Sequence, residues 1–317
     1  MTNDDRRITN PPPPDRSHVG TERRNTRTER LHEMSVDECV ATIVREDRAV
    51  FDAMACAQSV ISAFVRAAEP GFTRGGRLIY LGAGTSGRLG VLDASEAPPT
   101  FHVEHTRIIG LIAGGDGSLR KSSEGREDDP REFDGQLDAL ALTADDSVIG
   151  IAAGGTTPCV LGALAHVAQL ATPPTTPITA LLTCSPMDAP VGVDHLIVID
   201  TGAEVITGST RMKGGTATKL ALNTISTTLM VRAGKVHENL MVDLRATNDK
   251  LRDRGARIIT TLTTLERGGA LELLERAHGN VKAAVLMQRG ALGFDDAVCA
   301  LDAHGGRLHD ALRAHAD

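Results

Sequence analysis

The stretch Arg77-Leu-Ile-Tyr-Leu-Gly-Ala-Gly-Thr-Ser-Gly-Arg-Leu-Gly-Val-Leu-Asp-Ala-Ser-Glu-Ala-Pro-Pro-Thr100 decides the fold. Leu78–Leu81 are a short apolar run typical of a buried parallel strand, and a glycine-rich turn with two hydroxyls follows it. Free N–H groups and the positive end of a helix dipole favour phosphate there, and glycine lets the backbone approach it closely. The residues expected to bind an anion are Gly84, Thr85, Ser86 and Gly87.

Four further apolar runs have the length of parallel strands. They are Ile108–Ala113, Val148–Ala152, Ile178–Thr183 and Leu196–Ile199. Helical stretches lie between most of them, notably Cys159–Leu170. This alternation predicts an α/β fold, a doubly wound parallel five-stranded sheet with helices on both faces. Ligands of such sheets bind at the carboxyl ends of the strands.

The rest of the chain divides by composition. Residues 1–20 are polar and proline-rich, which predicts a disordered arm, and by composition Thr21–Asn25 continues it. A capping box at Ser35 and Glu38 begins helical spacing that Pro70 and Gly71 are expected to end. We therefore expect an N-terminal helical segment over 21–70 that packs on a main domain over 71–234. Ala/Leu-rich helical patterns predict a small C-terminal helical domain over 235–317.

Composition excludes several classes of function. The net charge of -7, one Tyr and no Trp disfavour a nucleic-acid surface. Five scattered cysteines disfavour disulfides and structural zinc, and His102 and His105 lack a third ligand, so no metal is expected. No signal peptide is apparent and no apolar run reaches the roughly 18 residues of a membrane span. We expect a cytoplasmic protein with small-molecule ligands.

Two further loops repeat the combination of glycines, hydroxyls and a following helix. Ala153–Pro158 follows the third strand, and Thr207–Gly215 follows the fifth and adds cations. Each could instead be an ordinary capped turn. The residues expected to contact an anionic ligand are Gly155, Thr156, Thr157, Ser209 and Lys213.

A dinucleotide site is the first alternative for the turn after the first strand, because Gly82–Gly87 fits the GxGxxG pattern. That reading needs an acidic residue at the end of the second strand to bind the ribose. Here two glycines separate Asp116 from the end of the second strand. The sequence therefore disfavours a dinucleotide.

Carboxylates follow the first two strands. Glu96 lies near the end of a helix that Pro98 and Pro99 are expected to terminate, and we expect it inside the binding edge. The negative end of a helix dipole disfavours the charged form of a carboxylate. The group then takes up a proton more readily, which suits a role in proton transfer. The acidic run 122–129 offers a second group, and spacing does not choose between its members or exclude an ordinary acidic helix start. Those members are Glu124, Glu127, Asp128 and Asp129.

Several motifs together closely resemble the N-acetylmuramic acid 6-phosphate etherase family. They are Leu81–Gly90, Leu92–Glu96, Gly110–Gly115, Glu124–Asp128, Thr207–Lys213, Asn239–Asp243, Ala246–Asn248 and the Thr21-Glu22…Asn25 segment. The resemblance runs from about Thr21 to the last helices. It implies a sugar isomerase (SIS) domain over 71–234 with a helical C-terminal domain, a homodimer, and no metal or redox cofactor.

The resemblance also implies an activity. The family cleaves the lactyl ether of a phosphorylated amino sugar, N-acetylmuramic acid 6-phosphate, during cell-wall sugar recycling. Glu96 matches one catalytic glutamate of the family and Glu127 matches the second. A phosphosugar-binding regulator of the glucokinase-regulatory type and an aldose-ketose isomerase are the alternatives.

One loop departs from the family pattern. Where the family usually has Ala-Ser-Gly-Arg-Thr-Pro, this chain has Ala153-Gly154-Gly155-Thr156-Thr157-Pro158. A serine hydroxyl and an arginine are therefore missing from a loop expected to meet the phosphate. We expect weaker phosphate binding unless Thr156 and Thr157 compensate.

Overall fold

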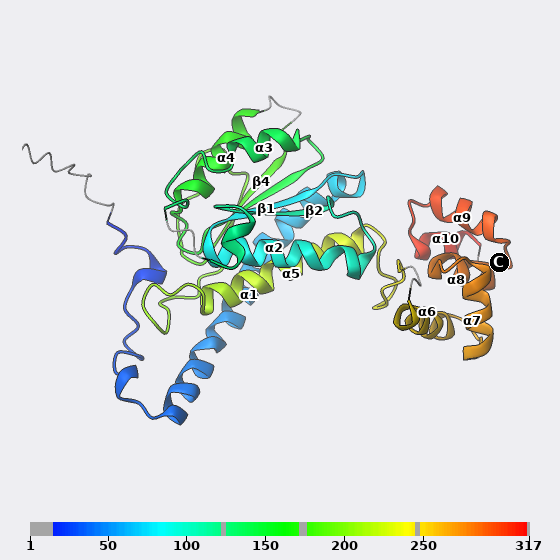
Figure 1. Ribbon diagram of the computed structural model, residues 1–317, viewed down its shortest axis with the longest axis horizontal. Coiled ribbons are helices and arrows are strands. Elements are labelled where there is room, and N and C mark those ends of the chain that lie inside the picture. Colours follow the sequence, from blue (N-terminus) through cyan, green and yellow to red (C-terminus); the bar gives the residue numbers. More distant parts are fainter. Residues whose placement is uncertain (1–14, 122–124, 171–175, 245–247, 316–317) are drawn as a thin grey trace, which may run out of the picture.

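The computed structural model describes residues 15–121, 125–170, 176–244 and 248–315. Its centre is a five-stranded, all-parallel sheet in the order β2-β1-β3-β4-β5 (Figure 1). The strands are β1 (Leu78–Gly82), β2 (Ile108–Ile112), β3 (Ser147–Ile151), β4 (Ile178–Thr183) and β5 (His195–Val198). The chain reverses its direction of winding between β1 and β3, and ligands of doubly wound sheets bind at such a switch point. The predicted fold class is confirmed.

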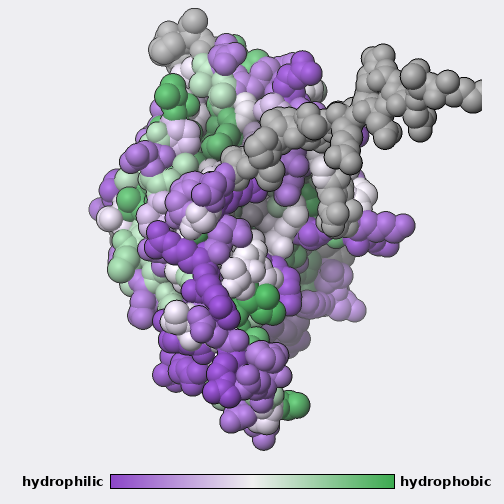
Figure 2. Space-filling model, turned by 90° about the vertical axis from the view of Figure 1, so that its left-hand side faces the viewer, coloured by the Kyte–Doolittle hydropathy of each residue, from purple (hydrophilic) through white to green (hydrophobic). Residues whose placement is uncertain are grey.

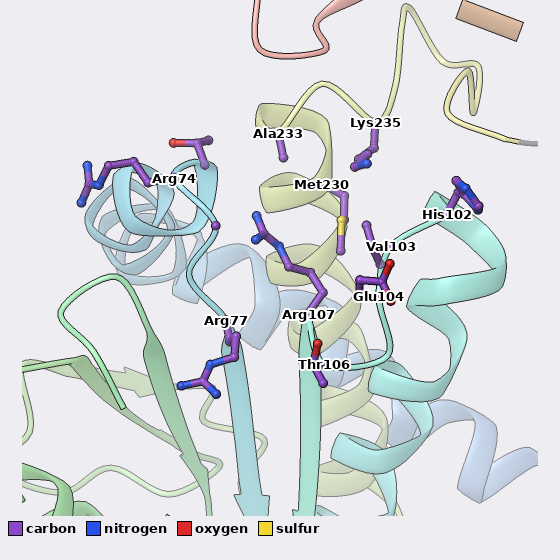
Figure 3. Close-up of a pocket in the computed structure, with 12 residues that line it drawn as sticks. Arg74, Arg77, His102, Val103, Glu104, Thr106, Arg107, Met230, Ala233 and Lys235 are labelled. Atoms are coloured by element: carbon purple, nitrogen blue, oxygen red, sulfur yellow. The ribbon is translucent and has the colours of Figure 1, made fainter. Parts of the chain in front are cut away.

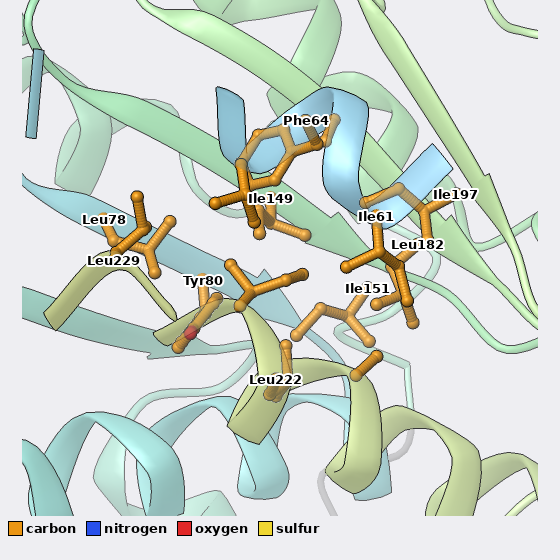
Figure 4. Close-up of a cluster of buried hydrophobic side chains, with 14 of the residues drawn as sticks. Ile61, Phe64, Leu78, Tyr80, Ile149, Ile151, Leu182, Ile197, Leu222 and Leu229 are labelled. Carbon is orange, nitrogen blue, oxygen red and sulfur yellow. The ribbon is translucent and has the colours of Figure 1, made fainter. Parts of the chain in front are cut away.

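Helices cover both faces of the sheet. Helices α1 (Val36–Thr73), α2 (Gly84–Phe101) and α5 (Lys213–Arg232) pack together on one face, and α3 (Asp134–Leu140) and α4 (Pro158–Leu170) cover the other (Figure 1). Successive residues of β1 point to opposite faces: Leu78 and Tyr80 belong to the core under α1 and α5, and Ile79 and Leu81 to the core under α4. Figure 4 shows the first of these cores.

Prolines do not end helices where the sequence predicted. Pro70 lies in the last turn of α1, which ends at Thr73, and Pro98 and Pro99 lie inside α2, which ends at Phe101. A proline inside a helix removes a backbone hydrogen bond. Buried side chains beyond the prolines, including Phe72 and Phe101, keep the last turns packed on the sheet.

The segment Asp15–Met34, here called the strap, is a second difference. Composition predicted that Thr21–Asn25 continues a disordered arm, but Val19, Thr21 and Asn25 are buried against the main domain. Short 3-10 turns occupy Gly20–Glu22 and Leu31–Glu33. Polar side chains can be buried when hydrogen bonds satisfy them, so composition alone misjudges such a segment. Residues 1–14 of the expected arm lie outside the described residues.

The C-terminal helices form a separate unit beyond the amino edge of the sheet (Figure 1). They are α6 (Asp249–Leu262), α7 (Arg267–Arg276), α8 (Val281–Arg289), α9 (Phe294–Ala303) and α10 (Leu308–Ala314). Lys282 joins this unit to the end of α5, because its Nζ donates to the Gly234 carbonyl at 3.2 Å and lies 3.2 Å from Asp243 Oδ2.

Only half of helix α1 is buried in the core of the protein. The capping box at Ser35 and Glu38 begins it, as predicted, and its C-terminal half lies in the core. Its N-terminal half extends past the sheet and exposes Val36, Val40, Val44 and Phe51. By length and composition alone α1 could cross a membrane, but core helices pass the same test, so the absence of a membrane span stays a prediction.

Candidate active site

The N-terminus of α2 is open to an anion. Ala83 stands at the N-cap position and makes no side-chain cap, so no described side chain takes the N–H groups of Thr85 and Ser86. A Cβ on Gly87 would lie 2.4 Å from the Gly82 carbonyl oxygen, so only glycine allows this turn to close. At the carboxyl end of β1 the turn therefore presents the N–H groups of Thr85 and Ser86, which have no partner among the described residues.

The loop after β3 lies beside this turn, because Gly82 and Ile151 are partners in neighbouring strands. Gly155 has φ +77°, and a Cβ there would lie 2.3 Å from Met187 Sδ. Thr156 and Thr157 follow it, both half-buried. Two of the three predicted loops thus meet at the topological switch point.

Glu127 lies at the same edge. Its backbone carbonyl accepts a hydrogen bond from the N–H of Cys159 at 3.0 Å, which fixes the backbone of Glu127 at the first turn of α4, while its side chain is exposed. Nearby, Glu132 Oε1 accepts from the N–H of Gly114 after β2 at 2.8 Å. Burial, followed by the charges of Glu127 and Glu132, raises the pKa of Cys159 to about 12. Of the four candidates in the acidic run, Glu124 lies outside the described residues.

The third loop differs, because its helix already holds an anion. The buried carboxylate of Glu204 accepts hydrogen bonds from the N–H groups of Lys213 at 3.0 Å and Gly214 at 2.8 Å, at the start of α5. Burial raises the pKa of Glu204 and these two donors oppose the rise. Helix α5 begins at Lys213, since the preceding residues form the loop that brings Glu204 there.

Lys213 does not lie where a substrate could reach it. Its side chain is 1% exposed, and Nζ donates to the Thr201 carbonyl at 2.9 Å and lies 3.8 Å from Glu46 Oε2. The predicted contact with an anionic ligand is therefore not supported, because the ammonium is held in a buried polar cluster. Ser209 remains half-buried in the loop at this edge.

Glu96 lies away from this edge of its own chain. It is twelve residues beyond Gly84 on α2, about 18 Å along the helix at about 1.5 Å per residue. One turn earlier, Asp93 accepts from the hydroxyl of Tyr80 at 2.9 Å, in the middle of β1. The expectation that Glu96 lies inside the binding edge is therefore wrong within one chain, because α2 runs back toward the amino edge.

The surroundings of Glu96 are open. It is exposed and lines a cavity of about 250 Å³ together with Lys219, Asn223 and the exposed Leu92. One chain thus holds the backbone of Glu127 at the edge that carries the α2 turn and places Glu96 farther along α2, and both side chains are exposed.

A larger cavity of about 550 Å³ lies at the opposite, amino edge of the sheet (Figure 3). Arg74 and Arg77 on its wall pair with Asp145 and Asp146, and Arg107 donates to the carbonyl of Phe72 near the end of α1. These cations are engaged by carboxylates or a helix end, where positive charge is favourable. The cavity is not the predicted site. Within the described ranges, no group of three metal-ligating side chains occurs.

Comparison with known proteins gives the family. The sequence model of the glucokinase regulatory protein N-terminal SIS domain matches residues 58–168. N-acetylmuramic acid 6-phosphate etherases from Pectobacterium atrosepticum and Serratia proteamaculans are 47% and 49% identical over 294 residues, which cover 92% of this chain and 95% and 97% of theirs. The etherase from Gloeobacter violaceus is 46% identical over 94% of this chain and 96% of its own.

Among solved structures, a phosphoheptose isomerase from Francisella tularensis matches 62% of this chain and 99% of its own, with a TM-score of 0.43 and 15% identity. The assignment does not rest on that likeness. It rests on relatives that match nearly the whole chain and are named for one activity, whereas the regulatory-protein model matches one domain. The chain therefore belongs to the N-acetylmuramic acid 6-phosphate etherase family.

Proposed function

We propose that this protein is a carbon-oxygen lyase that cleaves the D-lactyl ether of N-acetylmuramic acid 6-phosphate. The products are N-acetylglucosamine 6-phosphate and D-lactate. The observation that supports the proposal is an uncapped, glycine-lined helix N-terminus at the sheet edge that also carries the backbone of Glu127, in a chain that belongs to this family. The phosphate binds at Thr85 and Ser86, with the loop of Gly155, Thr156 and Thr157 beside it.

The reaction is an elimination followed by an addition. In the ring-opened sugar the C1 aldehyde acidifies the C2 proton, so one glutamate removes that proton while the C3–O bond breaks. The second glutamate protonates the departing ether oxygen, which leaves as lactate. Water then adds to C3 and a proton returns to C2. Each proton transfer contributes typically about 10² to 10⁴-fold, and phosphate bound at a distance holds C2 in place.

The two glutamates come from two subunits. Both must reach one substrate, yet Glu96 lies about 18 Å along α2 from the phosphate turn of its own chain. In a homodimer, Glu96 of the partner subunit would enter the site that holds Glu127. Exposed apolar side chains support such an interface, since Leu92 beside Glu96 and Phe51 on α1 are 47% and 66% exposed.

The other expected properties follow from the proposed reaction. Glu96 is the principal acid or base, and the division of roles with Glu127 is left to experiment. The elimination involves no redox change, so we propose no redox cofactor, and with two glutamates moving the protons we propose no metal. A substrate released during cell-wall recycling is processed in the cytoplasm, where we place the protein.

The test is incubation with N-acetylmuramic acid 6-phosphate in heavy water, with lactate measured enzymatically and deuterium at C2 by NMR. We expect both lactate and C2 deuterium from the wild type, and strong loss of both in Glu96→Gln and Glu127→Gln. Asp128→Asn, an exposed neighbour of Glu127, is the control and should behave as wild type. Saturable binding without lactate or deuterium would contradict the proposal and favour a regulator, and ketose from glucosamine 6-phosphate would favour an isomerase.

A further inference from the structure

The strap is fixed to the carboxyl edge of the sheet by buried hydrogen bonds. The carbonyl of Thr21 accepts from the N–H of Gly208 at 3.1 Å, and the N–H of Thr21 donates to Ser185 Oγ at 3.2 Å. Farther along, Thr28 Oγ1 donates to the carbonyl of Val205 at 2.8 Å. The strap is therefore held in place on both sides of Glu22.

Asn25 also anchors the strap, on the C-terminal side of Glu22. It is 4% exposed, and its Nδ2 donates to Glu46 Oε2 at 2.8 Å, on the buried side of α1. Arg27 donates two further hydrogen bonds, of 2.6 and 2.7 Å, to the same Glu46 carboxylate. The backbone around Glu22 thus has little freedom, although Glu22 itself is exposed.

The carboxylate of Glu22 lies over the loop that follows β5. A Cβ on Gly208, whose φ is +75°, would lie 2.9 Å from Glu22 Oε2. Ser209, a predicted substrate-binding residue, comes next in the chain. No side chain in the described part of the protein forms an ion pair or a hydrogen bond with this carboxylate. The face on which the strap lies is largely hydrophilic (Figure 2).

A short series of contacts joins Glu22 to the phosphate turn. The N–H of Thr210 donates to the Gly208 carbonyl at 3.0 Å. A Cβ on Gly215 would lie 3.4 Å from both the carbonyl oxygen of Thr210 and Cγ2 of Thr85. The segment from Gly208 to Gly215, over which the Glu22 carboxylate lies, therefore adjoins the turn that is expected to bind phosphate.

We propose that Glu22 is a substrate-positioning residue of this site, an inference that rests on the proposed function. An ionised carboxylate only accepts hydrogen bonds, and it repels other anions. It therefore faces the uncharged donors of the sugar, a hydroxyl or the acetamido N–H, and turns the phosphate toward Thr85 and Ser86. In this way Glu22 fixes the orientation in which C2 and C3 meet the catalytic glutamates.

The test compares Glu22→Gln with the control Glu33→Gln, which removes a strap carboxylate that pairs with Arg30 instead. Two probes are titrated by calorimetry, N-acetylglucosamine 6-phosphate and inorganic phosphate. We expect Glu22→Gln to weaken binding of the sugar phosphate about tenfold, as for a hydrogen bond to a charged group, and not to weaken binding of inorganic phosphate. KM for the ether substrate should rise by a similar factor, and the control should match wild type in every measurement.

Three results would overturn the proposal: unchanged binding of the sugar phosphate, an equal loss for both probes, or a melting temperature that falls with Glu22→Gln but not with Glu33→Gln. The last would show that Glu22 only holds the strap. Failure of the proposed function is separate, because it would appear as a wild type that binds the sugar phosphate and releases no lactate. The binding comparison then still decides the role of Glu22.

Discussion

Glu46 is the residue whose replacement should disturb the strap and the start of α5 together. Its carboxylate is 4% exposed and joins Arg27 and Asn25 of the strap to the ammonium of Lys213. Glu46→Gln keeps the size of the side chain but removes the charge. Because a buried cation then loses its partner, we expect a large loss of stability.

The magnitude follows from the pKa. Hydrogen bonds from Arg27 are the main cause that lowers the pKa of Glu46 from 4.5 to about 2, against the opposing effect of burial. A difference of that size corresponds to about 3 kcal/mol of stability for the ionised form. Since the folded pKa lies below the unfolded one, this stability is complete above pH 4.5 and disappears as the pH falls toward 2.

The assay is urea unfolding of wild type and Glu46→Gln between pH 7 and pH 3, with Glu33→Gln as an exposed control on the strap. At pH 7 we expect the free energy of unfolding of Glu46→Gln to be about 3 kcal/mol below that of wild type. This difference should shrink as the pH falls below 4.5. A difference that stays constant with pH, or one no larger than that of the control, would refute the reasoning.

Two further substitutions test the loops of the site. Gly87→Ala places a Cβ 2.4 Å from the Gly82 carbonyl oxygen, so it should weaken binding of N-acetylglucosamine 6-phosphate at least about tenfold by calorimetry, whereas Gly135→Ala, whose Cβ meets nothing within 4 Å, should not. Equal affinities would show that the turn is not the phosphate site. Gly154→Ser places a Cβ 3.6 Å from Thr21 Oγ1, a buried hydroxyl that has no hydrogen-bond partner among the described residues, and should raise the free energy of unfolding by about 1 kcal/mol in urea. A decrease would mean that the serine cannot reach Thr21.

The substitution Gly154→Ser tests the loop whose sequence departs from the family pattern. The sequence predicted that loss of a serine at position 154 weakens phosphate binding. The geometry connects that position to the strap instead, since Thr21 and Val19 are the nearest groups to a Cβ there. A residue's place in a loop can be predicted from sequence, but the element that covers it cannot.

The sheet was predictable because its strands are buried on both faces and appear as unbroken apolar runs. Glycines then mark each turn, which located the α2 N-terminus and Gly155. Helix ends were harder, because packing of Phe72 and Phe101 outweighs the cost of the prolines before them.

The polar interior was not predicted. Glu46 and Glu204 look like surface charges in the sequence, and Lys213 was expected to contact a ligand, yet all three are buried and their charged groups have protein partners. The position of Glu46 one turn before Val50, on the face of α1 that becomes buried, was the available signal. Nothing comparable marks Glu204, whose role depends on the loop that returns it to α5.

The position of Glu96 shows why motifs alone do not define a site. Its family match names it as catalytic, but the direction of α2 separates it from Glu127 within one chain. We propose that two chains together bring both glutamates to one substrate, and a distance between subunits cannot be predicted from the sequence.

Mixing Glu96→Gln with Glu127→Gln tests this central claim most directly. Each inactive homodimer is purified, the two are mixed at equal concentration under conditions that allow subunit exchange, and lactate release is followed. If each site uses Glu127 of one chain and Glu96 of the other, every heterodimer regains one intact site, and activity should rise to about a quarter of wild type. If the mixture stays inactive although mass spectrometry shows heterodimers, the two glutamates do not act across subunits and the account is contradicted.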